Sequence, residues 1–172
     1  MRRAAWILPV LFLAGCGKKS GGAGRLDMGW TGADTGRLAM PATAHWCPAD
    51  TVLVLQGIEA DSGAAIAIFP ADSVTPGVYP VGAPGQGLAR PRAGVALRRF
   101  GVNLVLGYYS LSGAVTVDSG SPLHGSFEAT LKGVNTGEQV NVTGGFRGLV
   151  AAPGGPTCQS PITDTTTDTV VR

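Results

Sequence analysis

The sequence predicts an all-β protein, folded as an antiparallel β-sandwich or a closed β-barrel of about 8–10 strands. Short apolar segments recur along the chain, and turn-forming residues separate them. Glycine accounts for 27 of 172 residues and is spread between these segments instead of forming a repeat. No segment after the N-terminal leader has a sustained 3.6-residue apolar period, so we expect almost no helix there.

Nine segments combine β-forming residues with alternating or continuous apolar positions, and each is expected to be a strand. They cover residues 38–46, 51–59, 64–69, 77–81, 94–100, 103–111, 114–118, 125–132 and 138–150. Turn signals lie between them, for example Asp61-Ser62-Gly63 and Asn135-Thr136-Gly137. Short connections of this kind join antiparallel neighbours.

Alternation is clearest in the last third of the chain, where it predicts which side chains face the core. The residues on the predicted core face are Phe127, Ala129 and Leu131 on one strand, Tyr109, Leu111, Gly113, Val115 and Val117 on a second, and Val140, Val142 and Phe146 on a third. The polar residues that alternate with them, such as Glu128 and Thr130, are expected to face water. We expect the three strands to form a meander.

Two further segments depart from simple alternation. Leu104 and Leu106 have the opposite phase to Tyr109, which predicts a β-bulge or bend at Gly107. Residues 52–55, Val-Leu-Val-Leu, are apolar on both faces. That strand is therefore either central in the sheet or covered on its outer face by the N-terminal segment containing Trp30.

The first 15 residues have the layout of a secretory signal peptide. Arg2 and Arg3 precede an apolar stretch at 4–14. Eleven residues extend about 16 Å as a helix, which is short of the roughly 20 residues that a membrane-spanning helix needs. We therefore interpret residues 1–15 as an export signal.

Leu13-Ala14-Gly15-Cys16 resembles the bacterial lipobox. The resemblance implies cleavage before Cys16, attachment of a diacylglyceryl group to its thiol, and acylation of the new amino group with a chain such as palmitate. Several acyl chains make a durable anchor. Gly17 follows the cysteine in place of the aspartate that retains lipoproteins in the inner membrane, so we expect the outer membrane.

Composition limits both the domain number and the partners. Removal of residues 1–15 leaves 157 residues and takes away two of the 13 basic residues. The remaining chain has 11 basic and 11 acidic residues, so its formal net charge is near zero. A nucleic-acid-binding protein usually has a strong basic excess, and we exclude that class. We expect a flexible tether at 16–24, a single β domain at 25–160 and a disordered polar tail at 161–172.

Five segments between residues 51 and 149 combine a turn with an alternating strand: Pro76-Gly77-Val78-Tyr79, Tyr109 with Ser112-Gly113-Ala114-Val115-Thr116-Val117, Leu123-His124-Gly125-Ser126-Phe127, Thr136-Gly137-Glu138, and Val140-Asn141-Val142-Thr143-Gly144-Gly145-Phe146. In these segments the region resembles a class of small, uncharacterised β-rich bacterial lipoproteins. The resemblance implies a β-rich fold and an envelope location. It implies no catalytic residues.

His45, which lies beside Trp46 and Cys47 and near Asp50, belongs to the densest group of reactive side chains. A metal site would need further ligands at a suitable spacing, but the second histidine, His124, lies in a separate turn-like segment. We therefore predict no metal site and interpret His45 as a hydrogen-bonded histidine on an edge strand.

Other candidate sites have simpler interpretations. Glu59 with Asp61 and Glu128 with Glu138 are the candidate carboxylate pairs for a glycosidase-like hydrolase. Any β protein with 11 acidic residues has such pairs, so they are weak evidence for catalysis. No Gly-x-Ser-x-Gly elbow is present in the sequence. The glycine-rich segment 82–87 precedes a strand and not a helix, so we interpret it as a surface loop and predict no cofactor.

Four arginines lie within ten residues, at Arg90, Arg92, Arg98 and Arg99. They are suited to contact with anionic lipid head groups near an anchor. The alternative is a solvated edge strand whose charges prevent aggregation, and this is our interpretation.

Cys47 and Cys158 are the two cysteines that remain once Cys16 is lipidated. Export places them in an oxidising compartment, where an isolated pair is usually bridged. We predict a disulfide between them, with Cα atoms about 4.4–6.8 Å apart. The alternatives are two free thiols or an intermolecular bridge.

These observations lead to three functional hypotheses. The first is a lipid-anchored envelope protein whose non-enzymatic β domain binds a partner or has a structural role. The alternative is a small-molecule or lipid carrier with a β-barrel cavity, and the third is an envelope hydrolase. A carrier needs an apolar interior cavity of about 300 Å³ or more, whereas a binding module has a filled core.

Overall fold

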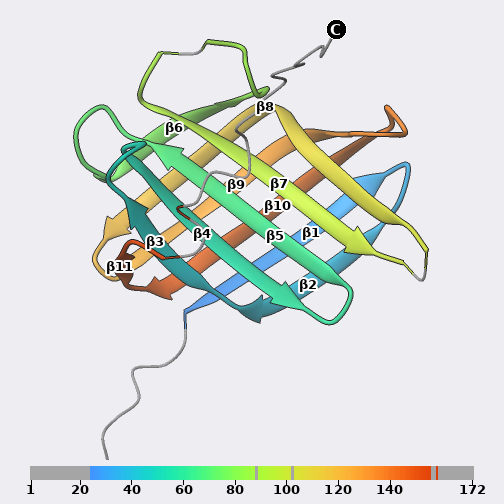
Figure 1. Ribbon diagram of the computed structural model, residues 1–172, viewed down its shortest axis with the longest axis horizontal. Helices are drawn as coiled ribbons and strands as arrows, with labels where there is room; N and C mark the ends of the chain where they lie inside the picture. Colours follow the sequence, from blue (N-terminus) through green and yellow to red (C-terminus); the bar gives the residue numbers. More distant parts are fainter. Residues whose placement is uncertain (1–23, 88, 102, 156–157, 159–172) are drawn as a thin grey trace, which may run out of the picture.

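The computed structural model describes residues 24–87, 89–101, 103–155 and 158 (Figure 1). Within these ranges the protein consists of strands and loops, without an α-helix, and no helix there is long or apolar enough to span a membrane. The strands are β1 (Arg25–Gly32), β2 (Gly36–Pro41), β3 (Thr43–Cys47), β4 (Val52–Glu59), β5 (Ser62–Phe69), β6 (Gly77–Gly82), β7 (Arg92–Phe100), β8 (Val105–Gly120), β9 (Leu123–Gly133), β10 (Gln139–Leu149) and β11 (Ala151–Pro153). The predicted all-β class is confirmed.

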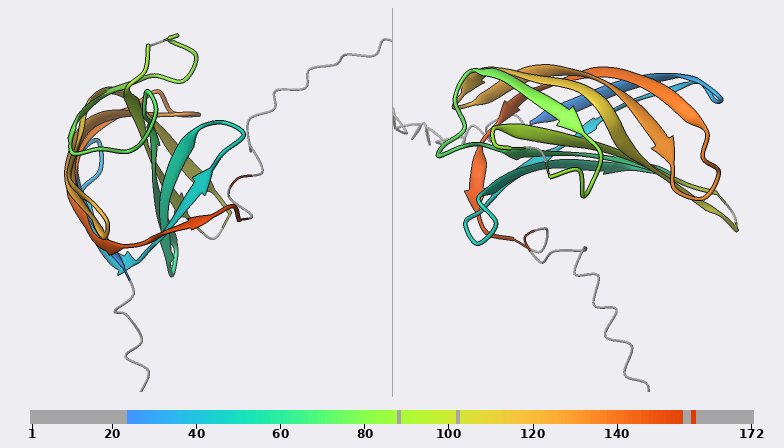
Figure 2. Two further views of the ribbon diagram at one scale, coloured as in Figure 1. Left: turned by 90° about the vertical axis from the view of Figure 1, so that its left-hand side faces the viewer. Right: turned by 90° about the horizontal axis from the view of Figure 1, so that it is seen from above.

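The strands form one curled sheet in the order β11-β3-β4-β5-β7-β6-β8-β9-β10-β1-β2. Figure 2 shows that the sheet wraps into a half-barrel around a single interior. Neighbouring strands are antiparallel except for β6 with β7 and β3 with β11, which are parallel. One continuous cluster of buried apolar side chains fills the interior.

The strand predicted at 38–46 is divided into β2 and β3 by a bend at Pro41 and Ala42. β2 pairs with β1 and β3 pairs with β4, so the bend carries the chain from one end of the sheet order to the other. Gly57 on β4 permits this close approach, because a Cβ atom there would lie 2.8 Å from both Met40 Cγ and the Pro41 carbonyl oxygen.

β1 is a strand that the sequence analysis did not identify. Leu26, Met28 and Trp30 are buried in the core and alternate with residues that are partly exposed. Trp30 therefore does not cover the outer face of residues 52–55. The other expectation for that segment is correct, since β4 lies between β3 and β5.

β8, β9 and β10 form the predicted meander. Phe127, Ala129 and Leu131 are buried, and so are Val140, Val142 and Phe146. Glu128 faces water. β8 is a single strand of 16 residues where the sequence predicted two, at 103–111 and 114–118.

The change of phase in β8 occurs at Leu111 and not at Gly107. The register of β8 against β9 shifts between Ser110 and Ser112, which marks a β-bulge. Tyr108 and Ser110 therefore face the interior before the bulge, and Val115 faces it after the bulge. The core positions predicted for Tyr109 and Leu111 are therefore wrong, since both are partly exposed, and Gly113, also predicted to face the core, is exposed.

The bulge lies where β8 exchanges one partner for another. β7 pairs with β8 as far as Tyr109, and β6 takes over from Ser112. Ser110, 2% exposed, sits in this fork. Its hydroxyl donates to the Gly82 carbonyl at 3.0 Å and accepts from the Val95 amide at 3.2 Å. A buried hydroxyl thus satisfies two backbone groups that the parting strands leave without ladder partners.

Candidate binding site at the Gly24 end

One end of the half-barrel carries the surface features that are suited to binding. We call it the Gly24 end, defined as the end at which β1, β4 and β9 begin and β5, β8 and β10 finish. It lies on the left in Figure 1. The first described residue, Gly24, and the disulfide-bonded Cys47 both lie there, since Gly24 precedes β1 and Cys47 pairs with Val52 at the start of β4.

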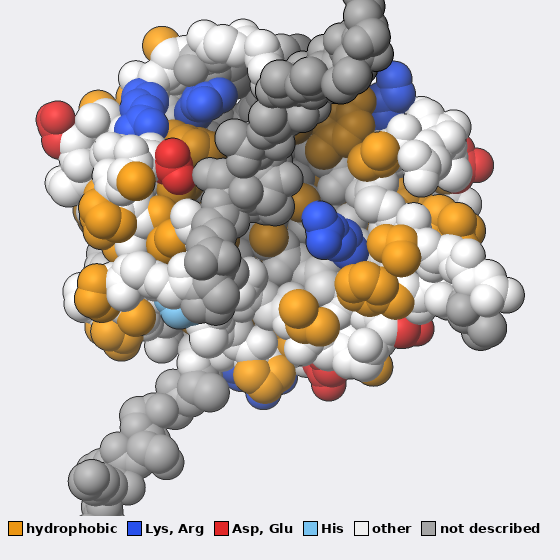
Figure 3. Space-filling view, viewed as in Figure 1, with side chains coloured by type: hydrophobic (Ala, Val, Ile, Leu, Met, Phe, Trp, Pro, Cys, Tyr) orange, Lys and Arg blue, Asp and Glu red, His pale blue; other side chains and the backbone are white. Residues whose placement is uncertain are grey.

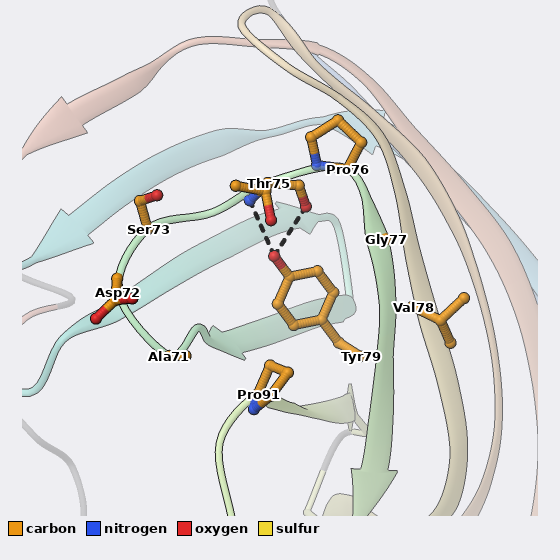
Figure 4. Close-up of a pocket in the computed structure, with 9 residues that line it drawn as sticks. All are labelled: Ala71, Asp72, Ser73, Thr75, Pro76, Gly77, Val78, Tyr79 and Pro91. Carbon is orange, nitrogen blue, oxygen red and sulfur yellow. Dashed lines mark hydrogen bonds between the residues drawn. The ribbon is translucent and has the colours of Figure 1, made fainter.

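The loop at 70–76, between β5 and β6, crosses the Gly24 end. The Tyr79 ring points into this loop, and its hydroxyl accepts a hydrogen bond from the Thr75 amide at 3.0 Å (Figure 4). The same hydroxyl donates to the Thr75 carbonyl at 2.8 Å. Tyr79 is 3% exposed, so its aromatic body is part of the core while its polar tip holds the loop.

A pocket of about 320 Å³ lies on one side of the loop. Residues 71–73, 75–79 and Pro91 line it (Figure 4). We call it the Tyr79 pocket. Its one tyrosine hydroxyl donates to the Thr75 carbonyl and accepts from the Thr75 amide, so it has no further hydrogen to donate to a ligand.

A second pocket, of about 350 Å³, lies on the other side of the loop. Its apolar lining consists of Trp46, Leu53, Val74, Leu123 and Ala151. The remaining lining residues are Asp72, Ser73 and Gly120. We call it the Trp46 pocket. The volume lies at the lower end of the range of ligand sites.

Burial distinguishes the floor of the Trp46 pocket from its rim. Leu53 and Leu123 are 2% and 1% exposed and belong to the core cluster, so they form the floor. Asp72, Ser73 and Ala151 are exposed and lie at the rim. In Figure 3, apolar side chains are exposed at the left, where Figure 1 shows β3 and β11, and others are exposed on the right of the same face. The pocket is an opening in the end of the core and not a cavity inside it.

The walls of the Trp46 pocket are fixed by the cross-link predicted from the sequence. The Cys47–Cys158 disulfide is present, with Cα atoms 5.2 Å apart. The Gly154 amide donates to the Trp46 carbonyl at 2.9 Å. These contacts hold β11, which carries Ala151, against β3, which carries Trp46.

His45 forms a hydrogen bond, as expected, between its Nδ1 atom and the Gly154 carbonyl at 2.8 Å. The expected edge-strand location needs correction, because β11 pairs with β3 on the side away from β4. Across residues 24–87, 89–101, 103–155 and 158, no group of three or more His, Cys, Asp or Glu side chains has the geometry of a metal site.

The chain enters the domain beside the Trp46 pocket. Gly24 lies against Leu149, where a Cβ atom would be 3.1 Å from the Leu149 Cα atom. Leu149 pairs with Leu123 across β10 and β9, and Leu123 forms part of the pocket floor. Cys16 lies outside the described residues, as do the predicted signal peptide at 1–15, the tether up to residue 23 and the tail at 161–172.

The interpretation of the arginines as a solvated edge strand is wrong. β7 is an interior strand, and the four residues divide between the two ends of the half-barrel. At the Gly24 end, Arg90 donates to the carbonyls of Asp50 and Thr51 at 2.6 and 3.1 Å. The Arg92 guanidinium lies 4.6 Å from the Phe69 ring centroid in a cation–π contact.

Arg99 lies at the opposite end, where it forms an ion pair with Asp34. Its guanidinium also lies 5.5 Å from the Trp30 ring centroid. Asp34 follows β1, so the contact joins the β1–β2 connection to the end of β7. This cluster closes the end of the half-barrel that lies opposite the two pockets.

Neither acidic pair forms a site in either pocket. Glu128 is opposite Thr143, while the Glu138 carbonyl accepts from the Gly133 amide. Five residues of β9 therefore separate the two positions, which is about 16 Å. Glu59, the last residue of β4, and Asp61, in the β4–β5 connection, are both exposed. Residues 83–87 of the predicted surface loop at 82–87 do form a loop, with 84–87 exposed, whereas Gly82 is the buried last residue of β6.

The comparisons with known proteins found no matching protein family, no matching curated protein and no matching solved structure. Sequence reasoning assigned no role to Val74 or Ala151, although both line the Trp46 pocket. Val74 comes from a loop and Ala151 from the three-residue strand β11, and both segments are too short for periodicity to predict which way a side chain points. Pro70 and Pro76, which bracket the loop between them, were the available signal.

Proposed function

We propose that this protein is a bacterial envelope lipoprotein, anchored by lipid on Cys16, whose non-enzymatic β domain binds an apolar group in the Trp46 pocket. The lipobox-like sequence Leu13-Ala14-Gly15-Cys16 is the observation that carries the proposal. The disulfide between Cys47 and Cys158 supports it, because such bridges persist in oxidising compartments outside the cytoplasm.

The chemistry of the Trp46 pocket favours binding over catalysis. Catalytic sites bring several polar side chains together around a reacting group. The side chains that line this pocket are apolar apart from Asp72 and Ser73 at its rim. An apolar cleft with few polar groups is typical of a site that recognises shape and hydrophobicity.

The filled interior favours a binding module over a carrier that encloses its cargo. Leu55, Ile66 and Val115 are fully buried on separate strands of the half-barrel and belong to one core cluster. A ligand in the Trp46 pocket would rest on the end of this core and remain partly exposed. The protein would then hold its ligand while staying attached to the membrane.

The absence of aspartate after Cys16 supports the outer membrane as the location. Together with the family resemblance described above, this feature supports our proposal that the protein is one of the small β-rich envelope lipoproteins. The tether at 16–24 would keep the Gly24 end, and with it the Trp46 pocket, close to the bilayer.

Membrane fractionation tests the anchor. Cells expressing the full chain are separated into soluble and membrane fractions, and the protein is compared with Cys16→Ser and with the tether control Ser20→Ala. We expect the parent chain and Ser20→Ala in the washed membrane fraction at the mature mass, and Cys16→Ser as the unprocessed precursor. Normal processing of Cys16→Ser, with release of the mature chain, would refute the proposal.

A further inference from the structure

We propose that the ligand of the Trp46 pocket is a single esterified acyl chain of a membrane lipid. This inference rests on the proposed function, because it takes the anchored state as its premise. The chain belongs either to the lipid on Cys16 or to a neighbouring lipid, and the chemistry that the pocket recognises is the same for both.

The floor and walls of the pocket fit an unbranched apolar chain. Leu53 and Leu123 present the apolar end of the core, and Trp46 forms a wall. Trp46 is itself partly exposed while it packs against the core cluster. A sugar or an ion would leave its polar groups without partners on such a surface. An acyl chain has none to satisfy along its length.

The rim selects between an ester and a free acid. Asp72 lies at the mouth with Ser73, and both are exposed. A free fatty acid would place its carboxylate near the negative charge of Asp72, which repels it. An ester carries no charge at that position. The pocket therefore favours an esterified chain, whose polar end stays in water beside the rim.

The position of the pocket brings it within reach of lipid. Gly24 contacts Leu149, which pairs with the pocket residue Leu123. Eight residues, at 17–24, join Cys16 to this point and span at most about 30 Å when extended. Gly24, at the same end of the half-barrel as the pocket, is thus held within one tether length of the bilayer surface, where acyl chains are the most abundant apolar ligand.

Tryptophan quenching provides a direct test. Trp30 and Trp46 are the tryptophans of the chain that begins at residue 16, and Trp30 lies at the far end of the half-barrel. The probe is a dibromostearoyl lysophosphatidylcholine below its critical micelle concentration, added to that chain carrying Cys16→Ser. We expect saturable loss of Trp46 emission, and Trp46→Phe should remove the response.

Two matched variants locate the site. Ala151→Phe adds an aromatic ring to the rim of the Trp46 pocket, and Ala71→Phe adds the same ring to the Tyr79 pocket. Both alanines are exposed, so both variants should fold, which a circular-dichroism melt verifies. We expect Ala151→Phe to weaken probe binding about tenfold or more and Ala71→Phe to change it by less than about twofold.

The lipidated protein in detergent distinguishes the two sources of the chain. With both chains in the same detergent, quenching equal to that of the Cys16→Ser chain assigns the pocket to a neighbouring lipid, whereas loss of quenching in the lipidated protein alone assigns it to the protein's own lipid. Both results support an acyl-chain site. Absence of quenching in the Cys16→Ser chain, quenching retained in Trp46→Phe, or equal weakening by the two phenylalanine variants would overturn it. The three overturning results come from chains without lipid, so they do not depend on the anchor, which fractionation tests separately.

Discussion

The disulfide between Cys47 and Cys158 should contribute a large part of the stability of the domain. The perturbation is the double variant Cys47→Ala with Cys158→Ala, which removes the bridge without leaving a lone thiol at a position that is 1% exposed. The bridge closes a loop with a sequence separation of 111 residues. On the chain-entropy relation a loop of that length corresponds to nearly 5 kcal/mol, and we expect a loss of about 3–5 kcal/mol.

Urea unfolding followed by circular dichroism measures this loss. The dependence of the unfolding free energy on urea should also steepen, because the unbridged chain exposes more surface when it unfolds. The parent protein under reducing conditions should behave like the double variant. Thr43→Ala is the control, since Thr43 is an exposed residue of the same strand as Cys47. If the double variant and the reduced protein both stayed within about 1 kcal/mol of the oxidised parent, the reasoning would be refuted.

Three further substitutions test the packing. Phe127→Ala should destabilise the domain by about 3–5 kcal/mol in urea unfolding, because its buried ring covers Gly144. Thr130→Ala, on the other face of the same strand, should change the unfolding free energy by less than about 1 kcal/mol, and equal losses for the two variants would contradict the assigned faces. Ser110→Ala should lose about 1–3 kcal/mol, since two buried backbone groups lose their partner, and an unchanged unfolding midpoint would disprove that role. Gly57→Ala should lose about 1–3 kcal/mol, because the new methyl group meets Met40 and the Pro41 carbonyl; a neutral result in the same assay would show that the β2–β4 contact yields easily.

Features that depend on local alternation could be predicted from the sequence. Phe127 and Leu131 on β9, and Val142 and Phe146 on β10, lie on the faces that their spacing indicated. These strands have antiparallel neighbours and one solvated face, which is the condition under which a period of two is reliable. β1 has the same alternation, in Leu26, Met28 and Trp30, so this strand could also have been predicted from the sequence.

Features that depend on long-range pairing could not be predicted. The bulge at Leu111 arises because β6 replaces β7 as the partner of β8, and Gly107 was the more plausible place on local grounds. The bend at Pro41 exchanges β1 for β4 as the partner of the chain. Proline within a predicted strand does signal a strand edge or a bend, but it does not reveal the new partner.

The candidate site also has one feature that the sequence could predict, the disulfide, and one that it could not, the Trp46 pocket. Counting cysteines sufficed for the disulfide, because the predicted lipidation of Cys16 leaves Cys47 and Cys158 as the one possible intramolecular pair. The Trp46 pocket draws Val74 from the β5–β6 loop and Ala151 from β11, far apart in sequence. No spacing rule joins such residues, and only the curled sheet brings them to one end of the core.

Mass spectrometry of the mature protein, purified from membranes, tests the central proposal of a lipid anchor most directly. We expect an N-terminal peptide that begins at Cys16, with its thiol carrying a diacylglyceryl group and its amino group acylated. An N-terminus at another residue, or a Cys16 recovered without lipid from the membrane fraction, would contradict the anchor.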